Sequence, residues 1–212
     1  MKKIIEQIFE PQYVLFVEGD GASVIPAMMN NFVFDHVFYT GSTAVGKLLY
    51  QAAAHNLVPV TLELGGKSPC IVEADADITV AAKRIAIAKF SNAGQMCVAP
   101  DYLLVHSSVK DKLAEALKIT LQQFFGKDAA DCDHYGKIIN EKQFDRIIQY
   151  FNDGTMIYGG KHNRAKLYIE PTLMDNVSMS SSIMTDEIFG PVLPIIGFQT
   201  KEEAMLIINK HK

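Results

Sequence analysis

The sequence predicts an α/β protein with a mostly parallel sheet and helices on the faces of that sheet. Short runs rich in Val, Ile, Leu and Tyr alternate with longer segments whose apolar residues recur at helical spacing. These longer segments suit the crossover connections of roughly a dozen residues that parallel strands require. With 212 residues, of which 49% are hydrophobic and 21% charged, the chain can bury a sizeable core.

The first third of the chain is expected to alternate between helices and strands. Three helices are predicted, over residues 2–9, 22–30 and 43–55. Three strands are predicted, a buried one at Tyr13–Val17 and two more at His36–Tyr39 and Val58–Leu62. The glycines at positions 19 and 21 separate the first strand from the helix that follows it.

A second α/β unit is expected to begin near Pro69. Its predicted helices, of which the first has Asp77 near its start, cover Ile78–Phe90, Val109–Phe125, Glu141–Asn152 and Lys201–Lys210. Its predicted strands are Cys70–Val72, Tyr102–Val105, Met156–Tyr158, Tyr168–Leu173 and Val192–Phe198. The charged stretch Gly126–Tyr135 is predicted to be a loop.

The number of strands indicates how the domains are divided. Only about three strands precede Gly65, whereas a complete doubly wound domain has roughly five or six. Residues 1–64 are therefore expected to be the C-terminal part of such a domain, and residues 65–212 a second α/β domain truncated at its C-terminal end. On this interpretation the chain is part of a larger protein.

Composition disfavours several classes of protein. The net charge is −4, and no Lys/Arg cluster is interleaved with aromatic residues, so nucleic-acid binding is not expected. No apolar run reaches the length of a membrane-spanning helix. The three cysteines match neither a disulfide framework nor a zinc site, and the histidines show no metal-ligand pairing, so no metal is expected and the expected compartment is the cytoplasm.

The segment Phe90–Ala99 contains a candidate nucleophile, Cys97, just after a predicted helix. Gly94 permits close approach of the backbone to a ligand, and Asn92 and Gln95 supply amide groups beside the thiol. A cysteine in such a polar, partly open turn can act as a nucleophile. The alternative is that Cys97 is a small buried hydrophobic residue, which is a common fate of a free cysteine.

A carboxylate, Glu63, comes directly after the strand predicted at Val58–Leu62 and just before Gly65 and Gly66. Open α/β sheets bind ligands beyond the carboxyl ends of their strands. If Glu63 is buried there, its pKa would be raised and it could serve as a general base. The alternative is a surface or helix-capping carboxylate followed by a simple turn.

The segment Thr40–Lys47 lies between a predicted strand and a predicted helix, where backbone amides could bind an anion such as a pyrophosphate. Its glycines are Gly41 and Gly46, but no Ser or Thr follows Lys47, so it is not a Walker loop. The alternative is a helix that is simply capped by Ser42 or Thr43.

The segment Asp186–Val192 places Glu187 and Phe189 before a Gly-Pro turn and a strand. A carboxylate and an aromatic ring at this spacing could hold a ribose diol and flank a flat ring. The alternative is a polar loop in which Phe189 packs into the core.

Taken together and in this order, the segments resemble the aldehyde dehydrogenase superfamily. The matching pieces are Tyr39–Thr43, Glu63–Lys67, Asn92–Cys97 and Glu187–Pro191. The neighbouring stretches Val60–Cys70 and Cys97–Tyr102 look most like the class-three branch, which takes fatty and aromatic aldehydes. The resemblance covers essentially the whole chain.

This resemblance implies NAD(P)-dependent oxidation of a small-molecule aldehyde to a carboxylic acid. It assigns Cys97 as the nucleophile that forms a thiohemiacetal and then a thioester, and Glu63 as the general base. It also assigns residues to the NAD or NADP cofactor, namely Gly41, Ser42 and Gly46 at the phosphates, Glu187 at a ribose and Phe189 beside the nicotinamide. Residues 1–64 would then belong to the Rossmann-like cofactor-binding domain, and residues 65–212 would form the catalytic domain that carries the thiol.

The chain also departs from the family pattern. It contains no Trp, so the family's Pro-Trp-Asn segment, which completes the oxyanion site, is not present. The family's adenosine-ribose contacts and its bridging strands are not matched either, which leaves open the choice between NAD and NADP and the oligomeric state, although the full-length protein is expected to be a homo-oligomer. We therefore expect little or no dehydrogenase activity from this polypeptide alone. The alternative is a catalytically incompetent product, a structural remnant or binding module with at most residual thiol esterase activity.

Overall fold

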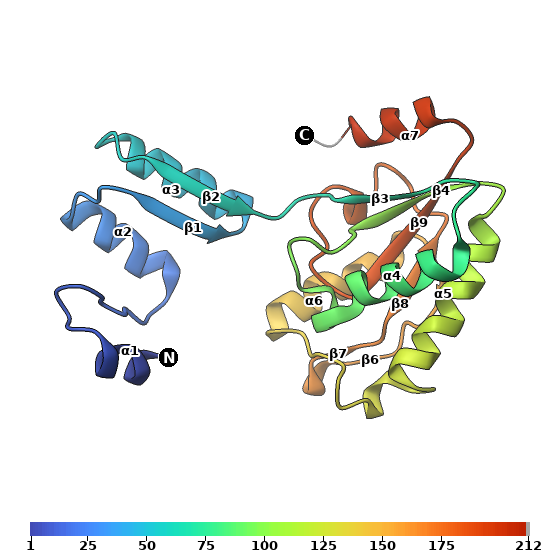
Figure 1. The fold of residues 1–212 in the computed structure, drawn as a ribbon, viewed down its shortest axis with the longest axis horizontal. Coiled ribbons are helices and arrows are strands. Elements are labelled where there is room, and N and C mark those ends of the chain that lie inside the picture. Colours follow the sequence, from blue (N-terminus) through green and yellow to red (C-terminus); the bar gives the residue numbers. More distant parts are fainter. Residues whose placement is uncertain (211–212) are drawn as a thin grey trace. The chain divides into compact units, whose positions relative to one another are not determined.

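The chain divides into two units, Met1–Leu64 (unit 1) and Gly65–Lys212 (unit 2). The computed structural model describes residues 1–210, so the last two residues of the expected second domain lie outside the described residues. Each unit has its own sheet (Figure 1). One buried cluster lies in unit 1 and two lie in unit 2.

Unit 1 is a short α/β segment built around one parallel pair of strands. Its elements are α1 (Lys2–Ile8), α2 (Gly21–Asn31), β1 (Val37–Gly41), α3 (Thr43–Ala54) and β2 (Val60–Leu64). β1 and β2 lie parallel, with Val37 opposite Val60 and Gly41 opposite Leu64, and α3 forms the crossover between them. The three predicted helices and two of the three predicted strands are therefore confirmed, although β2 begins two residues later than expected.

The strand predicted at Tyr13–Val17 is wrong. These residues form no strand, and the side chains of Tyr13 and Leu15 are 79% and 72% exposed. The stretch begins instead with a turn, in which the N–H of Tyr13 donates to the carbonyl of Glu10 at 2.9 Å. An apolar run becomes a strand only beside a partner strand, and the sheet of unit 1 pairs β1 with β2 alone among the described residues.

The core of unit 1 is small. Its buried members are Met29 from α2, Ala53 from α3 and Val58, and partly buried apolar side chains surround them. α3 begins at Ser42, whose side chain accepts a hydrogen bond from the N–H of Val45 at 3.4 Å. This is the N-cap arrangement that the sequence offered as the alternative to an anion-binding loop.

The sheet of unit 2 has five strands in the order β3-β4-β9-β8-β5. The strands are β3 (Pro69–Val72), β4 (Tyr102–His106), β5 (Thr155–Tyr158), β8 (Thr172–Asp175) and β9 (Val192–Phe198). Four of them are parallel, and only the edge strand β5 runs antiparallel, against β8. The prediction of a mostly parallel sheet is thus confirmed.

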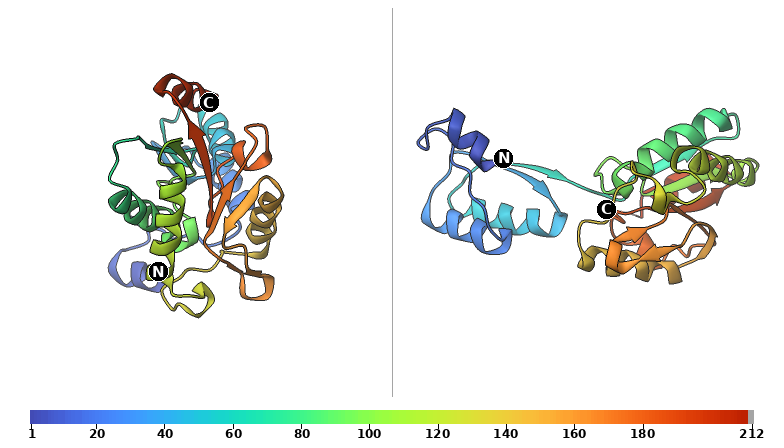
Figure 2. Two further views of the ribbon diagram at one scale, coloured as in Figure 1. Left: turned by 90° about the vertical axis from the view of Figure 1, so that its right-hand side faces the viewer. Right: turned by 90° about the horizontal axis from the view of Figure 1, so that it is seen from below.

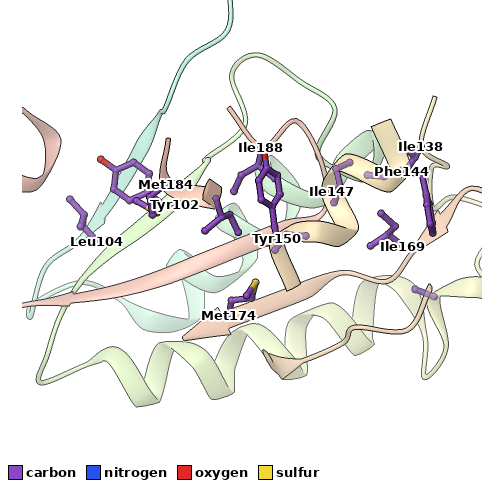
Figure 3. Close-up of a cluster of buried hydrophobic side chains, with 14 of the residues drawn as sticks. Tyr102, Leu104, Ile138, Phe144, Ile147, Tyr150, Ile169, Met174, Met184 and Ile188 are labelled. Atoms are coloured by element: carbon purple, nitrogen blue, oxygen red, sulfur yellow. The ribbon is translucent and has the colours of Figure 1, made fainter. Parts of the chain in front are cut away.

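Helices cover both faces of this sheet (Figure 2). α4 (Ile78–Phe90) and α5 (Lys110–Phe125) pack on one face, and α6 (Glu141–Gln149) and α7 (Lys201–Ile208) contribute to the cluster on the other. β4 shows why both faces are apolar, because its residues alternate between the two clusters. Leu103 and Val105 point to the α4/α5 side, while Tyr102 and Leu104 belong to the second cluster (Figure 3).

Two elements of unit 2 differ from the prediction. The single strand expected over Tyr168–Leu173 is divided into β7 (Tyr168–Ile169), which pairs with β6 (His162–Asn163), and β8. The division falls at Glu170 and Pro171, and proline has no N–H for a strand ladder. The expected helix Glu141–Asn152 is α6 followed by a 3-10 turn. In all, the structure has five such turns within the described residues, at Ser91–Gly94, Ala129–Asp131, Tyr150–Asn152, Arg164–Lys166 and Ser182–Met184.

No helix within residues 1–210 is both long enough and apolar enough to cross a membrane.

Candidate active site

Several segments of unit 2 meet at the edge of the sheet where its parallel strands begin. Gly65–Ser68 precedes β3, Asp101 precedes β4, and residues 183–191 precede β9. α4 connects the parallel strands β3 and β4 and runs back between them, so its last residue Phe90 and the segment up to Cys97 also lie at this edge. The carboxyl-end position predicted for Glu63 is found in β2, whereas these segments of unit 2 lie at the opposite end of their strands.

The backbone before Cys97 adopts an uncommon conformation. Asn92, Ala93 and Gly94 have φ angles of 51°, 53° and 73°, so three consecutive residues are left-handed. For a residue with a Cβ this conformation costs about 1–2 kcal/mol. At Gly94 a Cβ would also overlap the carbonyl of Gly190, so the thiol segment packs closely on the segment that contains Glu187. Strained backbone of this kind is concentrated at functional sites.

The side chains of Asn92 and Gln95 hold this segment in place. Gln95 Nε2 donates to the carbonyls of Asn92 at 3.0 Å and Lys137 at 2.9 Å, and Gln95 Oε1 accepts from the N–H of Ile139 at 2.9 Å. Asn92 Nδ2 donates in turn to the carbonyl of Gln95 at 3.1 Å. Both amides were expected to stand beside the thiol. In the structure the Gln95 amide ties the left-handed turn to Lys137 and Ile139, and the Asn92 amide bonds within the turn.

The three cysteines are free and differ in exposure. Cys97 is exposed, so its thiol is accessible to a reactant. Cys70 in β3 is half-buried, and this burial raises the pKa of its thiol, which disfavours the reactive thiolate. Cys132, in the loop predicted at Gly126–Tyr135, is half-buried because it packs against the cluster that contains Tyr102.

A buried ion pair joins the three segments that precede β3, β4 and β9, which we call the lead-in segments. Lys67 Nζ donates hydrogen bonds to Asp101 Oδ2, to the carbonyl of Ile183 and, at 3.2 Å, to the carbonyl of Asp186. The two charged side chains are 5% and 4% exposed. The other oxygen of Asp101 accepts from the N–H of Ile188 at 2.9 Å. Burial lowers the pKa of Lys67, and the attraction to Asp101 opposes that change.

Arg146 on α6 holds the same loop from the other side. Its guanidinium donates to the carbonyl of Glu187 at 3.2 Å and to that of Ile188 at 2.6 Å. The following residue, Phe189, has a φ of 46° and is 37% exposed. Ile188, and not Phe189, therefore provides the buried apolar anchor of this loop, and the aromatic ring stays at the surface.

The Glu187 carboxylate lies against the glycine pair that precedes β3. A Cβ at Gly65 would overlap this carboxylate in its present position, and the N–H of Gly66 donates to the carboxylate. Burial raises the pKa of Glu187, and the negative charge of Asp101 raises it further. The Gly66 hydrogen bond and the positive charges of Lys89 and Arg146 act in the opposite direction.

The remaining predicted site residues belong to unit 1. Glu63 is exposed in β2, where it pairs with Thr40, so the burial that would make it a poised base is not found in this unit. Gly46 is buried, and a Cβ there would come within 2.9 Å of a methyl group of Leu64, so this glycine serves packing of α3. A Cβ at Gly41 would overlap the Tyr39 hydroxyl.

Sequence reasoning missed the charged residues that support the loop. Asp101 and Arg146 looked like ordinary charged residues, and Lys67 was noted only as part of the glycine-pair segment. Lys89 is fully buried, and a signal for this was present because it continues the buried positions Ala82, Ile85 and Ala86 of α4 at helical spacing. A charged residue within such a stripe indicates a buried charge.

Comparison with known proteins gives the same assignment along the whole chain. Residues 1–212 match the aldehyde dehydrogenase family. The chain is 48% identical over 212 residues to the 4,4'-diaponeurosporen-aldehyde dehydrogenase of Staphylococcus aureus. This match covers 99% of this chain and 46% of that protein. It is also 48% identical over 179 residues to the dimeric NADP-preferring aldehyde dehydrogenase of Mus musculus, covering 84% of this chain and 40% of the mouse protein.

A solved structure agrees with these matches. The substrate-bound state of Staphylococcus aureus AldH superposes with a TM-score of 0.95 at 46% sequence identity, over 99% of this chain and 46% of that one. The chain thus spans about half the length of the curated relatives it matches. Its sequence and its fold agree on one assignment: the chain belongs to the aldehyde dehydrogenase family.

Proposed function

We propose that this chain is the catalytic portion of an enzyme that oxidises an aldehyde to a carboxylic acid with NAD or NADP. The observation that carries the proposal is the contact between Gly94 and Gly190, which packs the segment of the exposed Cys97 against the segment of Glu187 and Phe189. These two segments are about 90 residues apart in the sequence, and each has a role in the same reaction by resemblance to the family.

The residues present fit a nicotinamide dinucleotide. The Glu187 carboxylate accepts from one backbone N–H, Gly66, and a carboxylate has about four lone-pair sites, so acceptor capacity remains for the hydroxyls of a ribose. Phe189 offers an exposed ring beside it. In unit 1, Gly41 and Ser42 lead into the N-terminus of α3, which together with Gly46 we assign to the cofactor phosphates. When bound, NAD(P)+ supplies the acceptor for the hydride.

The chain's own residues carry out the remaining steps. The Cys97 thiolate adds to the aldehyde carbon, and the carbonyl π electrons move to oxygen to give a thiohemiacetal. The Cys97 N–H donates to this oxyanion, an interaction worth about 3 kcal/mol in other enzymes. After the carbon loses its hydride, a thioester on Cys97 remains. By resemblance to the family, Glu63 is assigned as the base that then removes a proton from water; the water oxygen adds to the thioester carbon, and the C–S bond breaks to release the carboxylic acid and the thiolate.

The first test combines calorimetry with mass spectrometry. We would titrate NAD+ into the 212-residue chain and record the intact mass after brief exposure to an aromatic ester such as p-nitrophenyl acetate. A single acyl adduct is expected in the original chain and in Cys132→Ser, the matched control, but not in Cys97→Ser. An adduct that persists in Cys97→Ser would overturn the assignment of the nucleophile.

The general base is tested in the same assay. In Glu63→Gln the acyl adduct is expected to form but to accumulate, because the water that should release it is no longer activated. Unchanged ester turnover in Glu63→Gln would refute this role.

NAD+ binding with a selective adduct supports a working site, whereas a selective adduct without NAD+ binding leaves thiol esterase activity as the function of this chain. Neither signal would favour a structural remnant.

A further inference from the structure

Lys89 is the most deeply buried charged side chain among the described residues and has no part in the proposed reaction. It lies in the last turn of α4 and is 0% exposed. Within residues 1–210 its ammonium group has no hydrogen-bond partner. A buried ammonium without compensation is strongly unfavourable, so its charge must be balanced by charges nearby.

The fold supplies those charges. Lys89 interacts favourably with Asp101 and Glu187 and unfavourably with Lys67. The four residues come from the end of α4 and from the lead-in segments of β4, β9 and β3, all at one edge of the sheet. When all are ionised, two positive and two negative charges balance. The C-terminal end of α4 adds a partial negative charge that favours a cation in its last turn.

Asp101 attracts Lys89 more strongly than Glu187 does, but the two carboxylates differ in the hydrogen bonds that they already accept. Lys67 uses its three N–H donors on Asp101 and on the carbonyls of Ile183 and Asp186, so it has none left for Glu187. Asp101 is satisfied by Lys67 and by a backbone N–H. From the backbone, the Glu187 carboxylate accepts a hydrogen bond only from the N–H of Gly66. Burial and the negative charge of Asp101 raise its pKa.

We propose that Lys89 is a positioning residue whose buried, unpartnered ammonium supplies the counter-charge that stabilises the Glu187 carboxylate beside Gly65 and Gly66. The significance for catalysis rests on the proposed function, in which Glu187 holds a ribose of the cofactor. Arg146 also acts on Glu187 with its positive charge, and Asp186 acts on Lys67 with its negative charge. Burial lowers the pKa of Lys89 to about 8, which leaves it charged at pH 7 and neutral in alkaline solution.

The test follows the titration of Glu187 in the full 212-residue chain without cofactor. Glutamate side chains labelled with ¹³C would be titrated by NMR in the original chain, Lys89→Met and Lys83→Met, with Glu187→Gln to assign the resonance. Lys83 is an exposed lysine on the same helix and serves as the matched control. The Glu187 midpoint is expected to move to higher pH in Lys89→Met and to stay in place in Lys83→Met.

A reciprocal measurement avoids dependence on one variant. The ¹³Cε resonance of Lys89 would be titrated in the original chain and in Glu187→Gln, where the loss of the negative charge should move the Lys89 midpoint to lower pH. A purely structural role for Lys89 would leave the Glu187 midpoint unmoved in folded Lys89→Met. If the Glu187 midpoint is unchanged in Lys89→Met and the Lys89 midpoint is unchanged in Glu187→Gln, the inference is overturned.

The two proposals fail in different ways. If the original chain binds no NAD+ but the Glu187 midpoint rises in Lys89→Met, the proposed function loses support while the pairing of Lys89 with Glu187 stands. If NAD+ binds equally well to the original chain and Lys89→Met and the Glu187 midpoint is unmoved, Lys89 has no positioning role although the proposed function is retained.

Discussion

Gly94 and Gly190 meet backbone to backbone, with no room for a side-chain carbon at Gly94. Gly94 is also the third residue of the left-handed turn before Cys97, with a φ of 73°. The conformation of the thiol segment and its packing on the Glu187 segment therefore depend on one residue that has no Cβ.

We expect Gly94→Ala to lower the free energy of unfolding by at least about 2 kcal/mol, because it combines the left-handed penalty with an overlap. Urea unfolding measures this change. Gly66→Ala is the matched control, because a Cβ at Gly66 meets no atom within 4 Å and its N–H remains available to Glu187. The control should stay within about 0.5 kcal/mol of the original chain. Equal effects of the two substitutions would show that the Gly94 contact is not essential.

Arg146 is expected to be the main support of the Glu187 segment from the α6 side. Arg146→Met removes the donors to the carbonyls of Glu187 and Ile188 and should cost about 2–3 kcal/mol. Amide hydrogen exchange of residues 187–190 should accelerate as well. Lys142→Met, an exposed substitution on the same helix, should change neither quantity. Unaltered exchange in Arg146→Met would mean that Asp101 and Lys67 hold the loop without it.

These supports show what could and could not be predicted from the sequence. α4 and β9 have the predicted bounds, Ile78–Phe90 and Val192–Phe198, because their apolar patterns are long and regular. Tyr13–Val17 failed because an apolar run does not reveal whether a neighbouring strand exists to pair with it. The single strand predicted over Tyr168–Leu173 was wrong because Pro171 within the run has no N–H to donate to a neighbouring strand.

The candidate site also contains residues that the sequence predicts and residues that it does not. Cys97, Glu187 and Phe189 lie in short motifs that can be recognised locally, whereas the groups that hold them in place are distant in sequence. No local pattern connects Lys67 with Ile183 or Arg146 with Ile188, because only the folded sheet brings these pairs together. The same holds for Gln95, whose side chain bonds residues 137–139 and does not face outward as a donor to a ligand.

The buried pair of Lys67 and Asp101 should be much more sensitive to substitution than an exposed pair. Asp101→Leu leaves the Lys67 ammonium buried without its counter-ion and should cost about 3–5 kcal/mol. The double variant Lys67→Met/Asp101→Leu should cost less than the sum of the single variants, since neither charge is then left unpaired. Lys161→Met breaks an exposed pair with Asp128 and should leave the free energy of unfolding nearly unchanged, because solvent screens that pair. Strict additivity of the two single effects would contradict a coupled buried pair.

Lys89 should give the stability of the chain a distinct pH dependence. Its pKa falls from 10.5 to about 8 in the folded chain, chiefly because of burial. Below about pH 8 both the folded and unfolded chains carry this proton, and above about 10.5 neither does. Between these values the unfolded chain binds more protons, so this group makes the free energy of unfolding rise with pH.

The effect is isolated by comparison with Lys89→Met, which cannot titrate at this position. As the pH rises from 8 toward 10.5, the free energy of unfolding of the original chain should rise relative to that of the variant, by an amount on the order of 3 kcal/mol over the whole window. Lys83→Met, an exposed substitution, should follow the original chain at every pH. Urea unfolding of the three chains across this range measures the difference, and parallel curves for the original chain and Lys89→Met would show that Lys89 keeps an ordinary pKa in the folded state.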